Sequence, residues 1–242
     1  PSHFTDPADE YHAVRGAAGL FDVGFLGRIE VAGTGAESLL QSLFTRDISK
    51  MAEGTALYGL LLNASGFILD TVLVFKLRPE GPGDRFLVTT DAVCTDKVLG
   101  WFKKNAHKNT VISDLTGTLA QFSLQGPQDD AVLEALSGVH FKKLKLKHIK
   151  TTTLLDTPVI VSRTGFTGER GYELFVPVDK AVALWNALLT SGSKLGLLPC
   201  GMTSRDMLRL EAGYVQYGLD VDETRTPVES NLMTVVDHHK SF

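Results

Sequence analysis

A long β-hairpin constrains the fold of this chain more than any other segment does. Residues 57–62 and 67–77 are rich in leucine, β-branched and aromatic side chains, and the turn-forming run Asn63-Ala64-Ser65-Gly66 separates them. Two strands joined by so short a turn pair in an antiparallel manner. The first half of the chain is therefore predicted to contain an antiparallel sheet.

Further strands and helices are predicted on both sides of this hairpin. Amphipathic spacing and helix-capping signals predict helices over 8–15, 95–106, 127–136, 180–189 and 202–212, and another that follows a Thr34-x-x-Glu37 capping box and runs through Leu43. Strands are predicted over 26–31, 85–90, 118–124, 159–163 and 172–176. The two kinds of element do not alternate regularly, which indicates an α+β fold with mainly antiparallel sheets. A weak boundary near Gly117 divides the chain into two expected domains, 1–117 and 118–242.

Composition excludes several functional classes. The 24 basic and 28 acidic residues give a net charge of −4, which disfavours binding to nucleic acid or to an anionic membrane surface. No run approaches the roughly 20 apolar residues that span a bilayer. The two cysteines form no Cys-x-x-Cys pair, and the adjacent His238 and His239 point to opposite faces of any strand, so no metal site is expected. A cytoplasmic location, or alternatively the mitochondrial matrix, is expected.

A glycine-rich segment leads to the most informative acidic residue. Gly165, Gly168 and Gly171 recur every three residues just before Glu173, which lies in a predicted strand. The segment is interpreted either as a ligand-binding loop or as a strained hairpin turn. A buried Glu173 would need paired donors, such as the N–H and exocyclic NH₂ of a pterin or guanine. The alternative is a glutamate that faces solvent.

Other polar and aromatic residues leave two interpretations open. Arg205 and Arg209 form either surface ion pairs or part of a site, and Tyr58 and Tyr214 belong either to the core or to a stacking platform. Between Phe141 and Lys150, lysines alternate with apolar residues at positions 143, 145 and 147. This pattern indicates a protected edge strand, or else a docking strip for an acidic partner or a polyanionic substrate tail.

The order of motifs along the chain resembles the aminomethyltransferase family, which includes the T-protein of the glycine cleavage system and its folate-dependent relatives. The resemblance extends over nearly the whole chain. It rests on His12–Arg15, Gly19–Val23, Thr45–Ser49, Tyr58, Leu62–Gly66, Leu124–Pro127, Ser162–Glu173 and Cys200–Ala212.

The resemblance implies a tetrahydrofolate site in the α+β fold. Glu173 matches the family's pterin-binding glutamate, and Arg205 matches the arginine beside the pterin. The residues that fall on positions lining the family's folate cleft are Leu26, Tyr58, Leu73, Phe75, Phe166 and Tyr214.

The chain departs from the family pattern on the side of the one-carbon donor. Asp70-Thr71 stands where the family usually has two aspartates, the second of which is considered catalytic. Alternation along a strand should turn Asp70 away from the face of Thr71. Asp91 and Cys94 replace two asparagines that the family usually carries. Our hypothesis is that Asp91 takes over proton handling near folate N5, with Thr71 as a hydrogen-bonding partner.

The resemblance and these departures together predict a tetrahydrofolate-dependent methyl or aminomethyl transferase with an altered donor site. The alternatives are a folate-binding protein without transferase activity, or the folate module of a multi-domain amine-demethylating enzyme. The expected partners are a small or carrier-bound one-carbon donor and an acidic carrier protein, with no nucleic acid or membrane. The small C-terminal barrel of the family is expected to be absent from the chain, which ends at Phe242.

Overall fold

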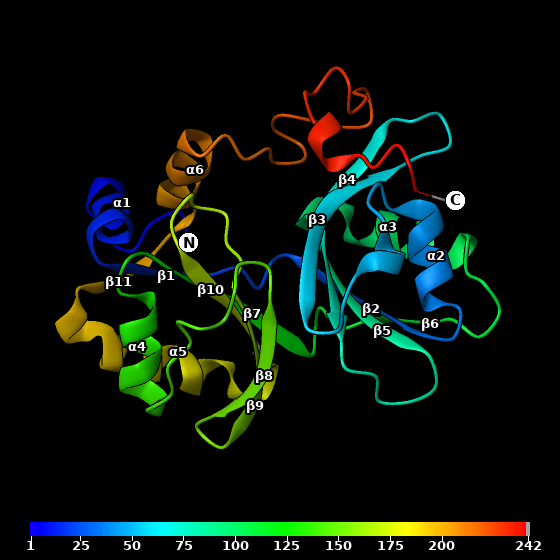
Figure 1. Cartoon of the computed structure of the whole chain (residues 1–242). Helices are drawn as coiled ribbons and strands as arrows, with labels where there is room; N and C mark the ends of the chain where they lie inside the picture. The colour runs from blue at the N-terminus through cyan, green and yellow to red at the C-terminus, as the bar shows by residue number, and fades with distance from the viewer. Residues whose placement is uncertain (241–242) are drawn as a thin grey trace. The chain divides into compact units, whose positions relative to one another are not determined.

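The computed structural model describes residues 1–240, and the chain divides into two compact units, each built on its own sheet (Figure 1). Unit 1 contains residues 1–25 and 117–214, and unit 2 contains residues 26–116 and the chain from Val215 onward. The expected domains of 1–117 and 118–242 differ from these units, although the chain does pass from unit 2 back to unit 1 at Gly117. The difference arises because strand pairing brings the first 25 residues to the second half of the chain.

Unit 1 contains a six-stranded sheet in the order β11-β1-β7-β10-β9-β8. Its strands are β1 (Ala18–Asp22), β7 (Leu119–Gln125), β8 (Ile149–Leu154), β9 (Thr157–Ser162), β10 (Gly171–Pro177) and β11 (Leu197–Cys200). Its helices are α1 (Pro7–Gly16), α4 (Asp129–Ser137), α5 (Val178–Gly192) and α6 (Met202–Glu211), with a 3-10 turn at Ser193–Leu195. All neighbouring strands are antiparallel except the parallel pair β1 and β11.

One face of the unit 1 sheet is closed by α4 and α5 (Figure 1). The core there joins Leu133 and Leu184 of these helices to sheet residues such as Tyr172 and Leu174. Because side chains alternate along a strand, Glu173 lies on the opposite face of β10.

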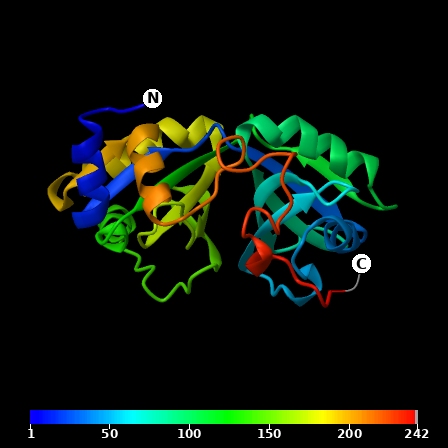
Figure 2. The same ribbon diagram turned by 90° about the horizontal axis from the view of Figure 1, so that it is seen from above.

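Unit 2 contains a five-stranded antiparallel sheet in the order β3-β4-β5-β2-β6. Its strands are β2 (Gly27–Gly33), β3 (Thr55–Leu62), β4 (Ile68–Leu77), β5 (Asp84–Thr90) and β6 (Val111–Asp114). Its helices are α2 (Ala36–Leu43) and α3 (Thr95–Lys104), with 3-10 turns at Ile48–Lys50, Ala92–Cys94 and Met233–Val235. Leu40 and Phe102 of the two α-helices pack on Val74 and Val88 of the sheet, and Figure 2 shows α3 along the sheet. The predicted hairpin is thus confirmed as β3 and β4.

The segment from Val215 to Lys240 completes unit 2 (Figures 1 and 2). Its Val221 and Leu232 are buried against Leu60 of β3 and Ile68 of β4. The Thr45 hydroxyl donates to the Val235 carbonyl at 2.8 Å. The packing gives these otherwise irregular residues a defined place beside the hairpin.

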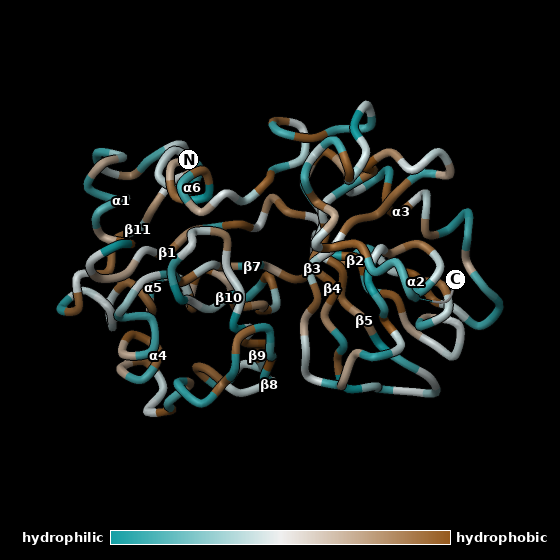
Figure 3. Tube along the Cα trace, turned by 45° about the horizontal axis from the view of Figure 1, so that its top comes forward, coloured by the Kyte–Doolittle hydropathy of each residue, from teal (hydrophilic) through white to brown (hydrophobic). Residues whose placement is uncertain are grey.

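The α+β class is confirmed, and the apolar (brown) residues of Figure 3 concentrate in the strands while α1 is largely hydrophilic. Two local predictions are wrong. The expected capping box is not formed: helix α2 has Gly35 as its N-cap with no side-chain capping bond, and Glu37 pairs with Lys76 at 3.1 Å. Residues 142–147 form turns rather than an edge strand, and the edge strand β8 begins only at Ile149. No helix within residues 1–240 is long and apolar enough to cross a bilayer.

Candidate functional site

Glu173 is a buried carboxylate on the face of the unit 1 sheet opposite α4 and α5. Only 9% of the residue is exposed, so the solvent-facing alternative is wrong. Its Oε1 accepts a hydrogen bond from Gln121 Nε2 at 2.9 Å, and its Oε2 accepts one from the Thr164 hydroxyl. Burial raises the pKa of Glu173, while these two hydrogen bonds and the positive charge of Arg205 act in the opposite direction. These two hydrogen bonds occupy two of the roughly four lone-pair positions of the carboxylate.

The Oε1 atom of Gln121 adds a second acceptor next to Glu173. Gln121 is 1% exposed, and its Oε1 has no hydrogen-bond partner within residues 1–240. A buried polar atom without a partner costs free energy, which favours a ligand donor at this position.

The glycine-rich segment wraps around one side chain, Gln125 of β7. Gln125 Nε2 donates to the Thr164 carbonyl at 3.1 Å, and its Oε1 accepts from the Thr167 hydroxyl at 3.1 Å. A Cβ atom at Gly165 or Gly171 would lie 2.0 Å or 2.3 Å from the Gln125 side chain, closer than packing allows. These two glycines therefore let the loop close on Gln125, which places Thr164 against Glu173.

A cation and two aromatic rings stack in the same unit. The Arg205 guanidinium of α6 lies 4.5 Å from the ring centroid of Phe166. The Phe166 and Tyr214 rings are stacked with centroids 5.4 Å apart and an interplanar angle of 17°. Arg205 is buried, whereas Tyr214 is 42% exposed. The structure thus brings four predicted site residues together in unit 1: Glu173, Arg205, Phe166 and Tyr214.

The other predicted site residues belong to unit 2. Tyr58 lies opposite Leu73 across β3 and β4 and shares a hydrogen bond with Thr71. Leu73 is half-buried, and Phe75 on the same face is fully buried. Leu26, also half-buried, precedes β2 and accepts a hydrogen bond at its carbonyl from the buried Arg28 guanidinium.

Two aspartates meet at the end of the unit 2 sheet. Asp70 is fully buried on the helix side of β4, as strand alternation predicts, with Leu61 as its cross-strand partner. Its Oδ2 accepts the backbone N–H of Asp91 at 3.0 Å, and its Oδ1 accepts that of Thr71 at 2.7 Å. Burial raises the pKa of Asp70 to about 8, and the nearby Asp91 adds to the rise. Asp91 is half-exposed and accepts a hydrogen bond from the Val93 amide at 3.2 Å. Near neutral pH, Asp70 is therefore largely protonated.

A sequence model of the GCVT N-terminal domain family matches residues 1–240. The chain belongs to this family. An aminomethyltransferase of Halothermothrix orenii is 39% identical over 241 residues, and one of Bacillus subtilis is 35% identical. These matches cover 100% and 99% of the chain, which spans 66% of the length of each relative.

Solved structures agree with the family assignment. The glycine cleavage system aminomethyltransferase T of Bartonella henselae superimposes with a TM-score of 0.86 and 29% identity, covering 96% of this chain and 61% of that one. A heterotetrameric sarcosine oxidase of Corynebacterium superimposes with a TM-score of 0.55 at 18% identity, covering 78% of this chain and 92% of that chain, which shows a shared fold.

In this GCVT domain, a buried acid that sequence reasoning missed holds the helix that carries Arg205. Glu10 of α1 is fully buried and accepts hydrogen bonds from the Gly201 amide at 2.8 Å and the Ser204 hydroxyl at 2.9 Å. It also accepts the Phe4 amide at 2.5 Å and the Thr5 amide at 2.9 Å. Burial alone would raise the pKa of Glu10, but these hydrogen bonds together lower it. The charged carboxylate thus caps the start of α6.

The sequence held faint signals for the missed residues of this domain. Asp70 itself was predicted to face away from Thr71, but not to be buried and protonated, although a lone acid within an apolar strand is a recognisable sign of a buried titratable group. Glu10 and Gln125 gave no such sign, because their partners lie up to 194 residues away in the chain.

Proposed function

We propose that this chain is the folate-binding, N-terminal part of a tetrahydrofolate-dependent aminomethyltransferase. The observation that carries the proposal is Glu173, a buried carboxylate with free acceptor capacity beside a cation and an aromatic stack. The family assignment and the name shared by its relatives support aminomethyl transfer.

The residues of unit 1 suit the chemistry of a pterin ring. A pterin presents an N–H beside an exocyclic NH₂, and both need acceptors when they are buried. Glu173 supplies a charged acceptor, and Gln121 Oε1 supplies a second, unpartnered one. The flat rings of Phe166 and Tyr214 suit stacking with an aromatic or heterocyclic part of folate.

Asp91 is proposed to handle the proton exchanged at a folate nitrogen. Thr71 stands where the family usually has its second aspartate, and Asp70 is held largely neutral by burial. Asp91, unlike the buried Asp70, is half-exposed. Its backbone N–H donates to the Asp70 carboxylate, which fixes its position. An Asp91→Asn enzyme should transfer aminomethyl groups at least about tenfold more slowly, since general acid–base groups contribute that much or more. Unchanged turnover would contradict this role.

Lys143, Lys145 and Lys147 are proposed to attract a negatively charged group. All three side chains are exposed in the turns that precede β8. The two candidates are an acidic carrier protein and the polyglutamate tail of folate, and we favour the tail because the proposed folate site requires no other partner.

Calorimetric titration with tetrahydrofolate tests the proposed function. Glu173→Gln replaces one acceptor oxygen by an NH₂ that faces donors, so binding should weaken by about 1–3 kcal/mol, or roughly 5–150-fold. Glu53→Gln, at an exposed position, is the matched control and should bind as the wild type does. Equal affinity in wild type and Glu173→Gln would contradict the proposal.

A further inference from the structure

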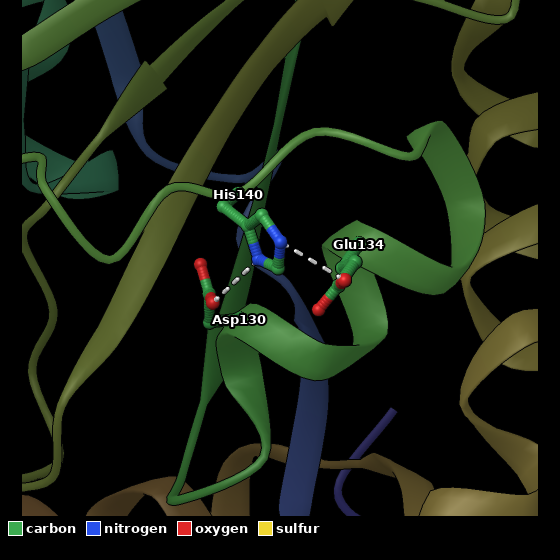
Figure 4. Close-up of side chains that lie close together, drawn as sticks. All are labelled: Asp130, Glu134 and His140. Atoms are coloured by element: carbon green, nitrogen blue, oxygen red, sulfur yellow. Dashed lines mark ion pairs between the residues drawn. The ribbon is translucent and has the colours of Figure 1, made fainter.

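We propose that α4 and the loop after it form a binding site for one divalent transition-metal ion, with Zn²⁺ as the best-matched cation. The three ligands are Asp130, Glu134 and His140, one atom from each lying within 4.8 Å of the others (Figure 4). Asp130 and Glu134 are four residues apart on α4, which puts both carboxylates on one side of the helix. None of the three ligands is among the residues proposed to bind the pterin ring.

The strongest observation is an oxygen of Asp130 that lacks a hydrogen bond. Asp130 is 2% exposed, and its Oδ1 accepts the Phe141 amide at 2.7 Å. Its Oδ2 is buried, points toward His140, and has no hydrogen-bond partner in the described chain (Figure 4). The cationic groups nearest to Oδ2 are His140 Nδ1 at 3.9 Å and Lys142 Nζ at 4.0 Å. An unsatisfied buried carboxylate oxygen is costly, and a bound cation would remove that cost.

The spacing of the three side chains suits a small metal ion. Glu134 Oε1 lies 3.1 Å from His140 Nε2, and Asp130 Oδ2 lies 3.9 Å from His140 Nδ1. Ligand atoms around tetrahedral zinc, with bonds of about 2.0–2.2 Å, are separated by roughly 3.3–3.6 Å. These two distances involve different nitrogens of His140, and only one of them can bind a given ion. One ligand atom from each residue lies within 4.8 Å of the others, so the exposed His140 and the half-exposed Glu134 would turn toward Asp130, which stays fixed by its other oxygen.

The mixed nitrogen and oxygen ligands decide between metals. One imidazole with two carboxylates suits zinc and its transition-metal neighbours, whereas Mg²⁺ and Ca²⁺ prefer oxygen ligands only. Three protein ligands leave a coordination position for water. A bound ion would join α4 to the loop through His140 and so hold the lysine-bearing turns at residues 142–147.

Without a metal, the same residues would form an ion pair. A doubly protonated His140 would bridge Glu134 and Asp130, with Lys142 as a further cation near Asp130. Removing Lys142 distinguishes a metal site from a metal-free ion pair. The positive charge of Lys142 repels an incoming metal ion, so its loss should strengthen metal binding.

Titration of the chelator-treated full chain with Co²⁺, followed by visible absorption and then by Zn²⁺ competition, tests the site. We expect one equivalent to bind, Zn²⁺ to displace Co²⁺, and Mg²⁺ to have no effect. His140→Gln should weaken binding at least about tenfold, and Lys142→Ala should strengthen it. His148→Gln, at a histidine in the same loop, is the matched control and should bind as the wild type does.

Two results would overturn the proposal. One is the absence of saturable binding in the wild-type chain, which would leave the cluster as an ion pair. The other is equal affinity in wild type and His140→Gln, which would place the bound metal elsewhere, for example at His238 and His239. Glu134→Gln, which changes a side chain on the helix surface, gives an independent check with the same expected direction.

Discussion

Asp70 combines complete burial with two backbone hydrogen bonds and no cationic partner within salt-bridge distance in residues 1–240. Its pKa rises to about 8 from an ordinary value of 3.8, mainly because burial disfavours the charged form. Between these two pH values, the folded chain binds a proton that the unfolded chain has released. This group therefore makes the free energy of unfolding decrease as pH rises, by up to about 1.4 kcal/mol per pH unit.

We predict that Asp70→Asn removes this pH dependence. The asparagine does not titrate, so the difference in unfolding free energy between wild type and variant should change between pH 5 and pH 8, in the direction that favours the variant at high pH. Urea denaturation of both proteins at several pH values measures it. Parallel pH profiles would show that Asp70 titrates at its ordinary pKa.

Single residues were predictable where a local pattern determined them. The alternation of β10 places Tyr172 and Leu174 in the core, and apolar flanks predicted that Glu173 lies in a strand. The protonation of Asp70 depends instead on Asp91, Cys94 and the α3 region closing around it, which no local pattern records. The Asp130, Glu134 and His140 cluster was missed because it combines a helix face with a loop.

Among the elements, α6 depends on a charge that belongs to α1. Glu10→Gln keeps the shape of the side chain but turns an NH₂ toward groups that donate hydrogen bonds. The unfolding free energy at pH 7 should fall by about 1–3 kcal/mol. Because the pKa of Glu10 is lowered, its contribution is present above the ordinary value of 4.5 and is lost as pH falls through the lowered value. Denaturation of both proteins should therefore show a smaller difference in unfolding free energy at pH 3 than at pH 7. The same difference at both pH values would contradict this.

The turns at residues 142–147 expose three lysines that would attract a polyglutamate tail. Changing Lys143, Lys145 and Lys147 together to Ser should weaken the binding of polyglutamylated folate more at low salt than at high salt, because salt screens exposed charges. Tetrahydrofolate with a single glutamate serves as the control ligand and should lose less affinity. An equal effect at both salt concentrations, or none, would remove the lysines from the proposed site.

Elements were predictable from the sequence except where distant partners decide their ends. The helix predicted over 8–15 is α1, which begins at Pro7 with the Asp6 carboxylate accepting the Ala8 amide at 2.8 Å. The lysine-rich run alternates like a strand, but Lys147 adopts a φ of 59° and ends any extended pairing. Arg163 instead donates to the Leu144 carbonyl at 2.7 Å, which stabilises the turns.

At the scale of the whole molecule, the chain passes between its two units three times. Unit 2 begins at Leu26 and its first segment ends at Thr116, and the buried Arg28 guanidinium binds both of these carbonyls. The sequence does not indicate that Arg28 joins these two ends of the segment. From the sequence alone, the weak boundary at Gly117 suggests two consecutive domains instead.

We predict that neither 1–117 nor 118–242 unfolds cooperatively when it is expressed alone. The first fragment lacks Val221 and Leu232, which bury Leu60 and Ile68, and the second lacks strand β1. Thermal melting followed by circular dichroism measures this. A cooperative transition in either fragment would show that it contains a complete folding unit.

If Glu173 binds the pterin ring itself, the ring alone should bind to the protein and should depend on Glu173. Wild type and Glu173→Gln are each titrated with tetrahydrofolate and with 6-methyltetrahydropterin, which lacks the benzoyl-glutamate tail. We predict that the variant weakens both ligands by the same factor, roughly 5–150-fold, because the lost interaction belongs to the shared ring. Undiminished binding of the pterin by Glu173→Gln would show that Glu173 does not hold the pterin ring.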